Sequence, residues 1–160
     1  MTDIIHIIKE KVKVLLEGSR GSHDLEHTER VLKIALHLAE KENADTGIVA
    51  LAALLHDIGR ERQDRSGGKV CHAEAGAKMA AAILDEHGVS PHTRDLVTAC
   101  IRSHRFRGKE RPISPEARVL FDADKLDSIG ATGIGRAFLF AGEVGAKLHN
   151  PDADLEKTAS

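Results

Sequence analysis

The 160-residue chain has no tryptophan or tyrosine, and its four phenylalanines are its only large aromatic side chains. Strands favour aromatic and β-branched residues, whereas helices favour the alanine and leucine that are abundant here. This balance predicts an all-α protein. No apolar stretch reaches the ~20 residues that a membrane-spanning helix needs, so we expect no membrane partner.

Cysteine and net charge are also scarce. The only cysteines, Cys71 and Cys100, lie in helical patterns and need not pair, which makes a reducing cytoplasm the default location. The first ten residues are largely apolar but carry four ionisable side chains, so we expect them not to form a signal peptide. The formal net charge of −2 argues against a nucleic-acid polymer as the partner. The sequence leaves room for a homodimer.

Apolar residues recur at helical spacing along most of the chain and predict a single domain, residues 1–160, with six to seven helices. We expect a covering helix within 1–20, the main helical core within 22–147 and a loose polar tail over 150–160. Ser90-Pro91 and Ser114-Pro115 are typical helix starts. The polar segment 60–69 predicts a loop, and the glycine-rich segment 129–135 predicts a bend.

The segment Leu51–Gly59 begins with an unbroken apolar run, continues with two adjacent polar residues, His56 and Asp57, and stops at a glycine. The apolar run predicts a helix buried on every side, and Gly59 predicts a left-handed turn at its end. A buried charge is costly unless it is paired or bound to a metal. Asp57 therefore either pairs with an arginine such as Arg60 or binds a metal, and His56 is either a core histidine or a second ligand.

Four further ionisable residues lie on inward-facing helical stripes: His27, His72, His104 and Asp124. One core-facing histidine is usually a buried residue with a hydrogen-bond partner. The same coincidence on five helices favours a shared metal ion. Mixed histidine and aspartate ligands without a cysteine cluster suit Mn²⁺, Co²⁺, Ni²⁺, Fe or Zn²⁺, with Mg²⁺ as a further candidate.

The ordered set His27, His56-Asp57-Ile58-Gly59 and Asp124 resembles the H…HD…D signature of the HD superfamily of metal-dependent phosphohydrolases. The resemblance extends over roughly residues 22–147. It implies an all-α fold and a divalent metal bound by His27, His56, Asp57 and Asp124. The segment 124–136 is similar to a small bacterial and archaeal group, some of whose members look like nucleoside triphosphate pyrophosphohydrolases.

A phosphorylated substrate also needs cationic neighbours. Arg60 and Lys125 each lie next to the expected ligands, so we predict that they bind substrate phosphate. A basic segment follows the fifth expected helix and is read as a solvated loop: Arg102, Arg105, Arg107, Lys109 and Arg111. Asp127, one helical turn after Asp124, either orients a ligand or water from the second shell or pairs with an arginine.

His72 and His104 have two possible roles. They either line the pocket of one metal, where they contact phosphate or transfer a proton, or bind a second metal. We favour one firmly held ion, because HD proteins with a second metal usually show a longer ligand set with paired histidines, and the chain has no His-His pair.

The leading hypothesis is a metal-dependent phosphohydrolase that acts with a metal-activated water on a small phosphorylated metabolite, most plausibly a nucleotide. A nucleoside triphosphate pyrophosphohydrolase and a nucleotidase are the two forms of it. A cyclic-nucleotide phosphodiesterase is disfavoured because no tyrosine or tryptophan is present to stack on a base. A di-iron oxygenase of the HD type and a non-catalytic metal- or nucleotide-binding module are the remaining alternatives.

Overall fold

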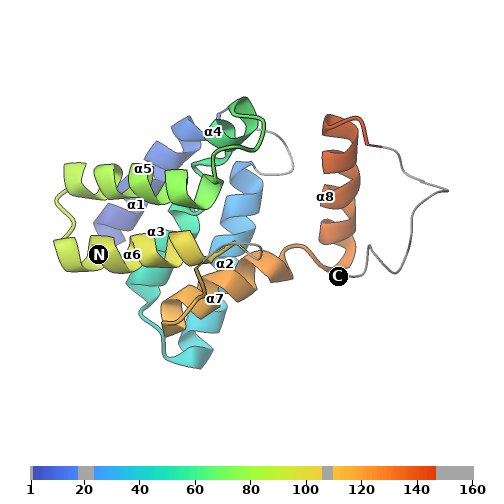
Figure 1. Cartoon of the computed structure of the whole chain (residues 1–160). Helices are drawn as coiled ribbons and strands as arrows, with labels where there is room; N and C mark the ends of the chain where they lie inside the picture. The colour runs from blue at the N-terminus through green and yellow to red at the C-terminus, as the bar shows by residue number, and fades with distance from the viewer. Residues whose placement is uncertain (1, 18–23, 106–109, 147–160) are drawn as a thin grey trace.

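The computed structural model describes residues 2–17, 24–105 and 110–146, and all regular structure in these ranges is helical (Figure 1). The helices are α1 (Thr2–Leu15), α2 (Leu25–Glu42), α3 (Thr46–Leu55), α4 (Arg60–Arg65), α5 (His72–Glu86), α6 (Pro91–Ser103), α7 (Pro115–Leu126) and α8 (Gly130–Glu143). The all-α prediction is confirmed. The seven longer helices match the expected six to seven, and the short α4 is additional.

Helix α3 forms the centre of the domain. Every residue from Gly47 to Leu55 is buried, and α1, α2, α5, α6 and α7 all pack against this helix. A helix that is apolar on all sides gains from burial on all sides, as the sequence predicts. The chain leaves α3 at His56 and Asp57, so these polar side chains start from the middle of the core.

Local capping chemistry places the helix starts. The side chains of Asp24, Asp45, Ser90 and Ser114 each accept a hydrogen bond from a backbone N–H in the first turn of α2, α3, α6 and α7. In each case one of the N–H groups that a helix start leaves unpaired is satisfied. The two Ser-Pro starts are therefore confirmed.

Gly59 has a different role from the one predicted. Its φ is −86°, so it does not adopt a left-handed turn. Helix α5 instead crosses so closely that a Cβ atom on Gly59 would lie 2.2 Å from the carbonyl oxygen of His72 and 2.6 Å from the nitrogen of Gly76. Glycine is needed here for close approach, which brings the start of α5 against the end of α3.

Two segments predicted to lack helix are helical. Helix α4 lies in the expected loop 60–69; its six residues are all charged or amide-bearing, so no apolar periodicity marks it. Helix α8 begins at Gly130, within the expected bend, and its Gly133 packs directly against Ser128, where a Cβ would lie 2.2 Å from the Ser128 carbonyl.

Helix α8 stands apart from the other helices (Figure 1). It makes no extensive contact with another described helix, and Gly133 is its only buried residue. Its exposed side chains are mostly apolar: Ile134, Phe138, Leu139 and Phe140 are 45–62% exposed.

Within the described ranges, no helix combines the length and the apolar character that a membrane crossing requires. The predicted tail, 150–160, lies outside the described residues, as do Arg107 and Lys109 of the basic segment.

Candidate metal centre

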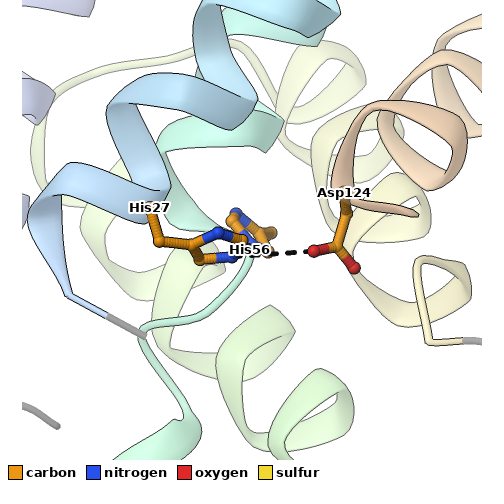
Figure 2. Close-up of side chains that lie close together, drawn as sticks. All are labelled: His27, His56 and Asp124. Carbon is orange, nitrogen blue, oxygen red and sulfur yellow. Dashed lines mark hydrogen bonds and ion pairs between the residues drawn. The ribbon is translucent and has the colours of Figure 1, made fainter. Parts of the chain in front are cut away.

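Six potential metal ligands converge on one buried region. His27 lies in the first turn of α2, His56 and Asp57 follow α3, His72 opens α5, His104 follows α6, and Asp124 lies in the last turn of α7. Their donor atoms form two groups of three, within each of which all atoms lie within 4.8 Å of one another. One group is His27, His56 and Asp124 (Figure 2), and the other is Asp57, His72 and His104.

Asp57 belongs to the second group but faces the histidines of both groups. Its Oδ2 is 3.6 Å from Nε2 of His27 and 3.7 Å from Nε2 of His56. Its Oδ1 is 3.7 Å from Nε2 of His72 and 3.8 Å from Nε2 of His104. The carboxylate therefore has the position of a bridge, with one oxygen toward each group.

The four histidines share one tautomer. Nδ1 of His56 and Nδ1 of His104 donate to the carbonyl oxygens of Ala53 and Ile101, three residues earlier, at 2.7 and 2.6 Å. Nδ1 of His27 donates to Oδ2 of Asp127, and Nδ1 of His72 donates to Oε1 of Gln63, both at 2.8 Å. Because Nδ1 carries the proton in a neutral ring, each Nε2 offers a lone pair.

Those lone pairs face one another. Nε2 of His27 lies 3.3 Å from Nε2 of His56, and Nε2 of His72 lies 3.2 Å from Nε2 of His104. Burial lowers the pKa of His27 to about 4 and of His72 to about 3, and it also lowers the pKa of His56. Two Nε2 lone pairs cannot hydrogen-bond to each other while both Nδ1 atoms donate, and a cation placed between the two nitrogens would satisfy both.

The spacing also fits a cation. Two donors about 2.1 Å from one ion, at the angles of tetrahedral or octahedral coordination, are about 3.0–3.4 Å apart. The Nε2 pairs have this separation, at 3.3 and 3.2 Å. His27, His56, Asp57, His72 and His104 are at most 2% exposed, and the Asp124 side chain is 14% exposed. The donor set is therefore buried, preorganised and suited to divalent metal.

Both predicted phosphate-binding cations contact a ligand carboxylate. Nε of Arg60 donates to Oδ1 of Asp57 at 2.9 Å, which is the ion pair that the sequence left open as the alternative to a metal ligand. Nζ of Lys125 donates to Oδ2 of Asp124 at 2.6 Å and to the carbonyl oxygen of His104 at 3.1 Å. Their role toward phosphate stays a prediction, but both lie at the edge of the donor set with partly exposed side chains.

Asp127 makes contacts that fit both roles that the sequence left open. It is 4% exposed and accepts from His27, from Arg30 and from Arg136. It thus orients a potential ligand and pairs with two arginines at once. Gln63, on the helix that the sequence did not reveal, has the same relation to His72. Nothing in the sequence separates Gln63, Arg30 or Arg136 from ordinary surface residues.

The other described arginines of the basic segment are Arg102, Arg105 and Arg111, and the first two are half-buried. Nε of Arg102 lies 3.4 Å from a carboxylate oxygen of Glu110, and Arg105 contacts the Cys71 sulfur at 3.5 Å. Arg102 lies within α6, not in a loop, and both arginines have protein partners, so the reading of these two residues as a solvated loop is wrong.

The sequence profile of the HD domain matches residues 24–129, which contain all six potential ligands. The chain belongs to the HD domain family. It is 36% identical over 152 residues to the uncharacterized protein YpgQ of Bacillus subtilis, covering 91% of this chain and 70% of that protein.

Solved structures agree with this membership. A predicted HD superfamily hydrolase from an uncultured Thermotogales bacterium superposes with a TM-score of 0.73 at 37% identity, over 84% of this HD protein and 74% of that chain. Bacillus subtilis YpgQ in complex with ADP superposes with a TM-score of 0.70 at 33% identity, over 91% and 74%. Ribonuclease Y of Pseudothermotoga lettingae is 30% identical over 122 residues, 76% of this chain but only 22% of that enzyme.

The buried neutral histidines of this HD domain make its metal-free form sensitive to acid. Since their folded pKa values lie below the ordinary 6.5, at about 4 for His27 and about 3 for His72, the unfolded chain binds more protons below pH 6.5. We expect the free energy of unfolding in EDTA to fall by about 1.4 kcal/mol per pH unit for each of these histidines as the pH drops from 6.5 toward 4. Urea denaturation at several pH values measures this slope.

Replacement of a buried histidine tests the origin of the slope. His72→Gln is expected to reduce the slope of the unfolding free energy against pH by about 1.4 kcal/mol per pH unit. The same change at His37, which is exposed on α2, should leave the slope as in the wild type. A free energy of unfolding that stays level between pH 6.5 and 4.5 contradicts the assignment of neutral rings.

Proposed function

We propose that this HD domain is a metal-dependent phosphohydrolase that cleaves a nucleotide, with divalent ions held at two adjacent positions. The observation that carries the proposal is the pairing of buried Nε2 lone pairs on either side of Asp57. The sequence favours a single ion, with His72 and His104 as pocket residues. The second group of three donors leads us to propose an ion there as well.

The six metal-binding side chains and the two rim residues Arg60 and Lys125 define the chemistry. A divalent ion at such a site lowers the pKa of water toward about 7 and neutralises charge on a phosphoryl oxygen. Asp57, with one oxygen toward the histidines of each group, would contact an ion at either position. Arg60 and Lys125 supply positive charge at the rim, where each exchanges its carboxylate contact for a substrate phosphate. The mixed histidine and carboxylate donors suit Mn²⁺, Co²⁺, Ni²⁺, Fe or Zn²⁺.

A nucleotide is the favoured substrate for two reasons. The related YpgQ was crystallised in complex with ADP. The cations near the donor set also suit a phosphate-rich small molecule, whereas the net charge of −2 does not suit a nucleic-acid polymer. Release of pyrophosphate from a nucleoside triphosphate and release of phosphate by a nucleotidase are the two forms of this proposal.

The test is hydrolysis of a nucleotide panel by metal-stripped protein reloaded with Mn²⁺, Co²⁺, Ni²⁺ or Mg²⁺, with product analysis by chromatography. A nucleoside monophosphate plus pyrophosphate identifies a pyrophosphohydrolase. Opening of a 3′,5′-cyclic nucleotide identifies the phosphodiesterase alternative, and cleavage of a short single-stranded RNA tests the chemistry that the name of ribonuclease Y describes. Absence of turnover with every metal supports the binding module and refutes the proposal.

The rim cations provide a more local prediction. We expect Arg60→Met and Lys125→Met each to raise KM, or to lower kcat/KM, about 10-fold or more, since a charged hydrogen bond contributes about 1.5–3 kcal/mol. Metal content is expected to stay unchanged, as measured by elemental analysis of the purified variants.

The control is Arg94→Met, which removes an arginine that pairs with Asp85 and Asp95 away from the donor set. Its kinetics should equal those of the wild type. Unaltered kinetics in both rim variants would return Arg60 and Lys125 to a purely structural pairing with the carboxylates.

A further inference from the structure

The four histidines differ in what fixes their rings. His56 and His104 donate to carbonyl oxygens three residues earlier, so the helix end itself orients them. His27 and His72 instead donate to side chains from other parts of the chain, Asp127 and Gln63. Each of the two donor groups thus contains one histidine whose orientation depends on a replaceable side chain.

Gln63 accepts two hydrogen bonds from His72. Its Oε1 accepts from the ring Nδ1 at 2.8 Å and from the backbone nitrogen of His72 at 3.2 Å. This pair of bonds links the middle of α4 to the first residue of α5. It satisfies one unpaired N–H at the start of α5 and sets the ring so that Nε2 points toward Asp57 and His104.

Asp127 accepts hydrogen bonds from His27 and from two arginines. It accepts from Nδ1 of His27 at 2.8 Å, from Nε and Nη2 of Arg30 at 2.8 and 3.3 Å, and from Nη1 of Arg136 at 2.7 Å. Arg30 comes from α2 and Arg136 from α8. A carboxylate so fixed keeps the His27 ring in place and increases the basicity of its Nε2, whereas the neutral Gln63 amide fixes His72 without adding charge.

We propose that Gln63 and Asp127 are positioning residues, each for one of the two metal positions: Gln63 through His72, and Asp127, held by Arg30 and Arg136, through His27. The proposal rests on the proposed function in that it assigns one ion to each donor group. The positioning proposal goes beyond the proposed function because it assigns one supporting side chain to each of the two ions.

The test is titration of metal-stripped protein with Mn²⁺ alone, with free Mn²⁺ followed by electron paramagnetic resonance. We expect two equivalents in the wild type. Gln63→Leu should weaken one of the two binding steps about 10–100-fold, and Asp127→Asn should weaken the other by a similar factor. Arg136→Met is expected to weaken the same binding step as Asp127→Asn, but by a smaller factor. Gln63→Glu, which keeps an acceptor oxygen, should restore the lost step.

Removal of the histidines assigns the steps. In a His72→Ala background, Gln63→Leu should add nothing, whereas Asp127→Asn should weaken the remaining binding step about 10–100-fold. In a His27→Ala background, Asp127→Asn should add nothing and Gln63→Leu should weaken the remaining step. Arg65→Ala, at an exposed arginine of α4 that pairs with Glu61, is the control for damage to that helix. Thermal melts in EDTA show whether each variant folds.

Equal weakening of both steps by each variant, or no weakening at all, would overturn the proposal. So would a loss of Mn²⁺ that follows only the melting temperature of the metal-free fold. A wild type that binds one equivalent refutes the two-ion part of the proposed function instead. In that case the positioning assignment is supported if one of the two variants alone weakens that ion, and it is refuted if both or neither do.

Discussion

Asp57→Asn is expected to abolish metal binding and to lower turnover on the order of 1,000-fold or more, because it removes a carboxylate that faces the histidines of both donor groups. Asparagine keeps the shape of the side chain, and its amide oxygen still accepts from Nε of Arg60. The metal-free fold should therefore survive. Elemental analysis, turnover on the active nucleotide and thermal melts in EDTA measure the three quantities.

Asp122→Asn is the matched control. Asp122 lies on α7 two residues before Asp124, but its side chain is exposed. This variant should keep its metal and its full turnover. An Asp57→Asn protein that retains two equivalents of metal would contradict the bridging position of Asp57, and one that fails to fold in EDTA would show that the ion pair with Arg60 is structural.

Gly59→Ala is expected to destabilise the protein by about 3 kcal/mol or more, which is large for the addition of one methyl group. The new Cβ would lie 2.2 Å from the carbonyl oxygen of His72 and 2.6 Å from the nitrogen of Gly76, and backbone atoms cannot move aside as a flexible side chain does. The start of α5 must shift, so His72 should also leave its place. Urea denaturation measures the loss, and Mn²⁺ titration measures the displaced ligand.

Gly135→Ala provides the comparison. Gly135 lies within α8, and a Cβ there would meet nothing within 4 Å. Because alanine favours the helix over glycine by about 1 kcal/mol, this variant should be at least as stable as the wild type. Equal stability of the two alanine variants would mean that α5 does not press against Gly59.

Most of the fold and the donor set followed from local patterns. Helical periodicity placed His27, His72, His104 and Asp124 on inward faces, because a side chain three or four residues from a buried one shares its direction. Capping chemistry located helix starts such as Asp24, since the hydrogen bonds there are made within one turn.

The remaining features depend on contacts between distant segments. Gly59 has an ordinary helical φ, and its requirement for glycine arises only from α5, which the residues around Gly59 do not reveal. Helix α4 contains no apolar residue, so its pattern resembles a loop, and Gln63 was overlooked with it. Arg30 and Arg136 are 97 and 9 residues from Asp127, and their sequence surroundings are those of surface arginines. The position of Asp57 toward the histidines of both donor groups likewise exists only in the assembled fold.

The isolation of α8 means that the molecule does not open as one unit. Backbone amides of the buried α3 exchange their hydrogens only when the core opens, so their protection approaches the free energy of global unfolding. We expect amides of α8, which makes no extensive contact with another described helix, to exchange through a local opening that needs much less free energy than global unfolding. That opening breaks the contact between Arg136 and Asp127 and leaves the core folded. A bound ion stabilises the folded core by mass action, and it acts on α8 through the hydrogen bonds that run from His27 to Asp127 and on to Arg136.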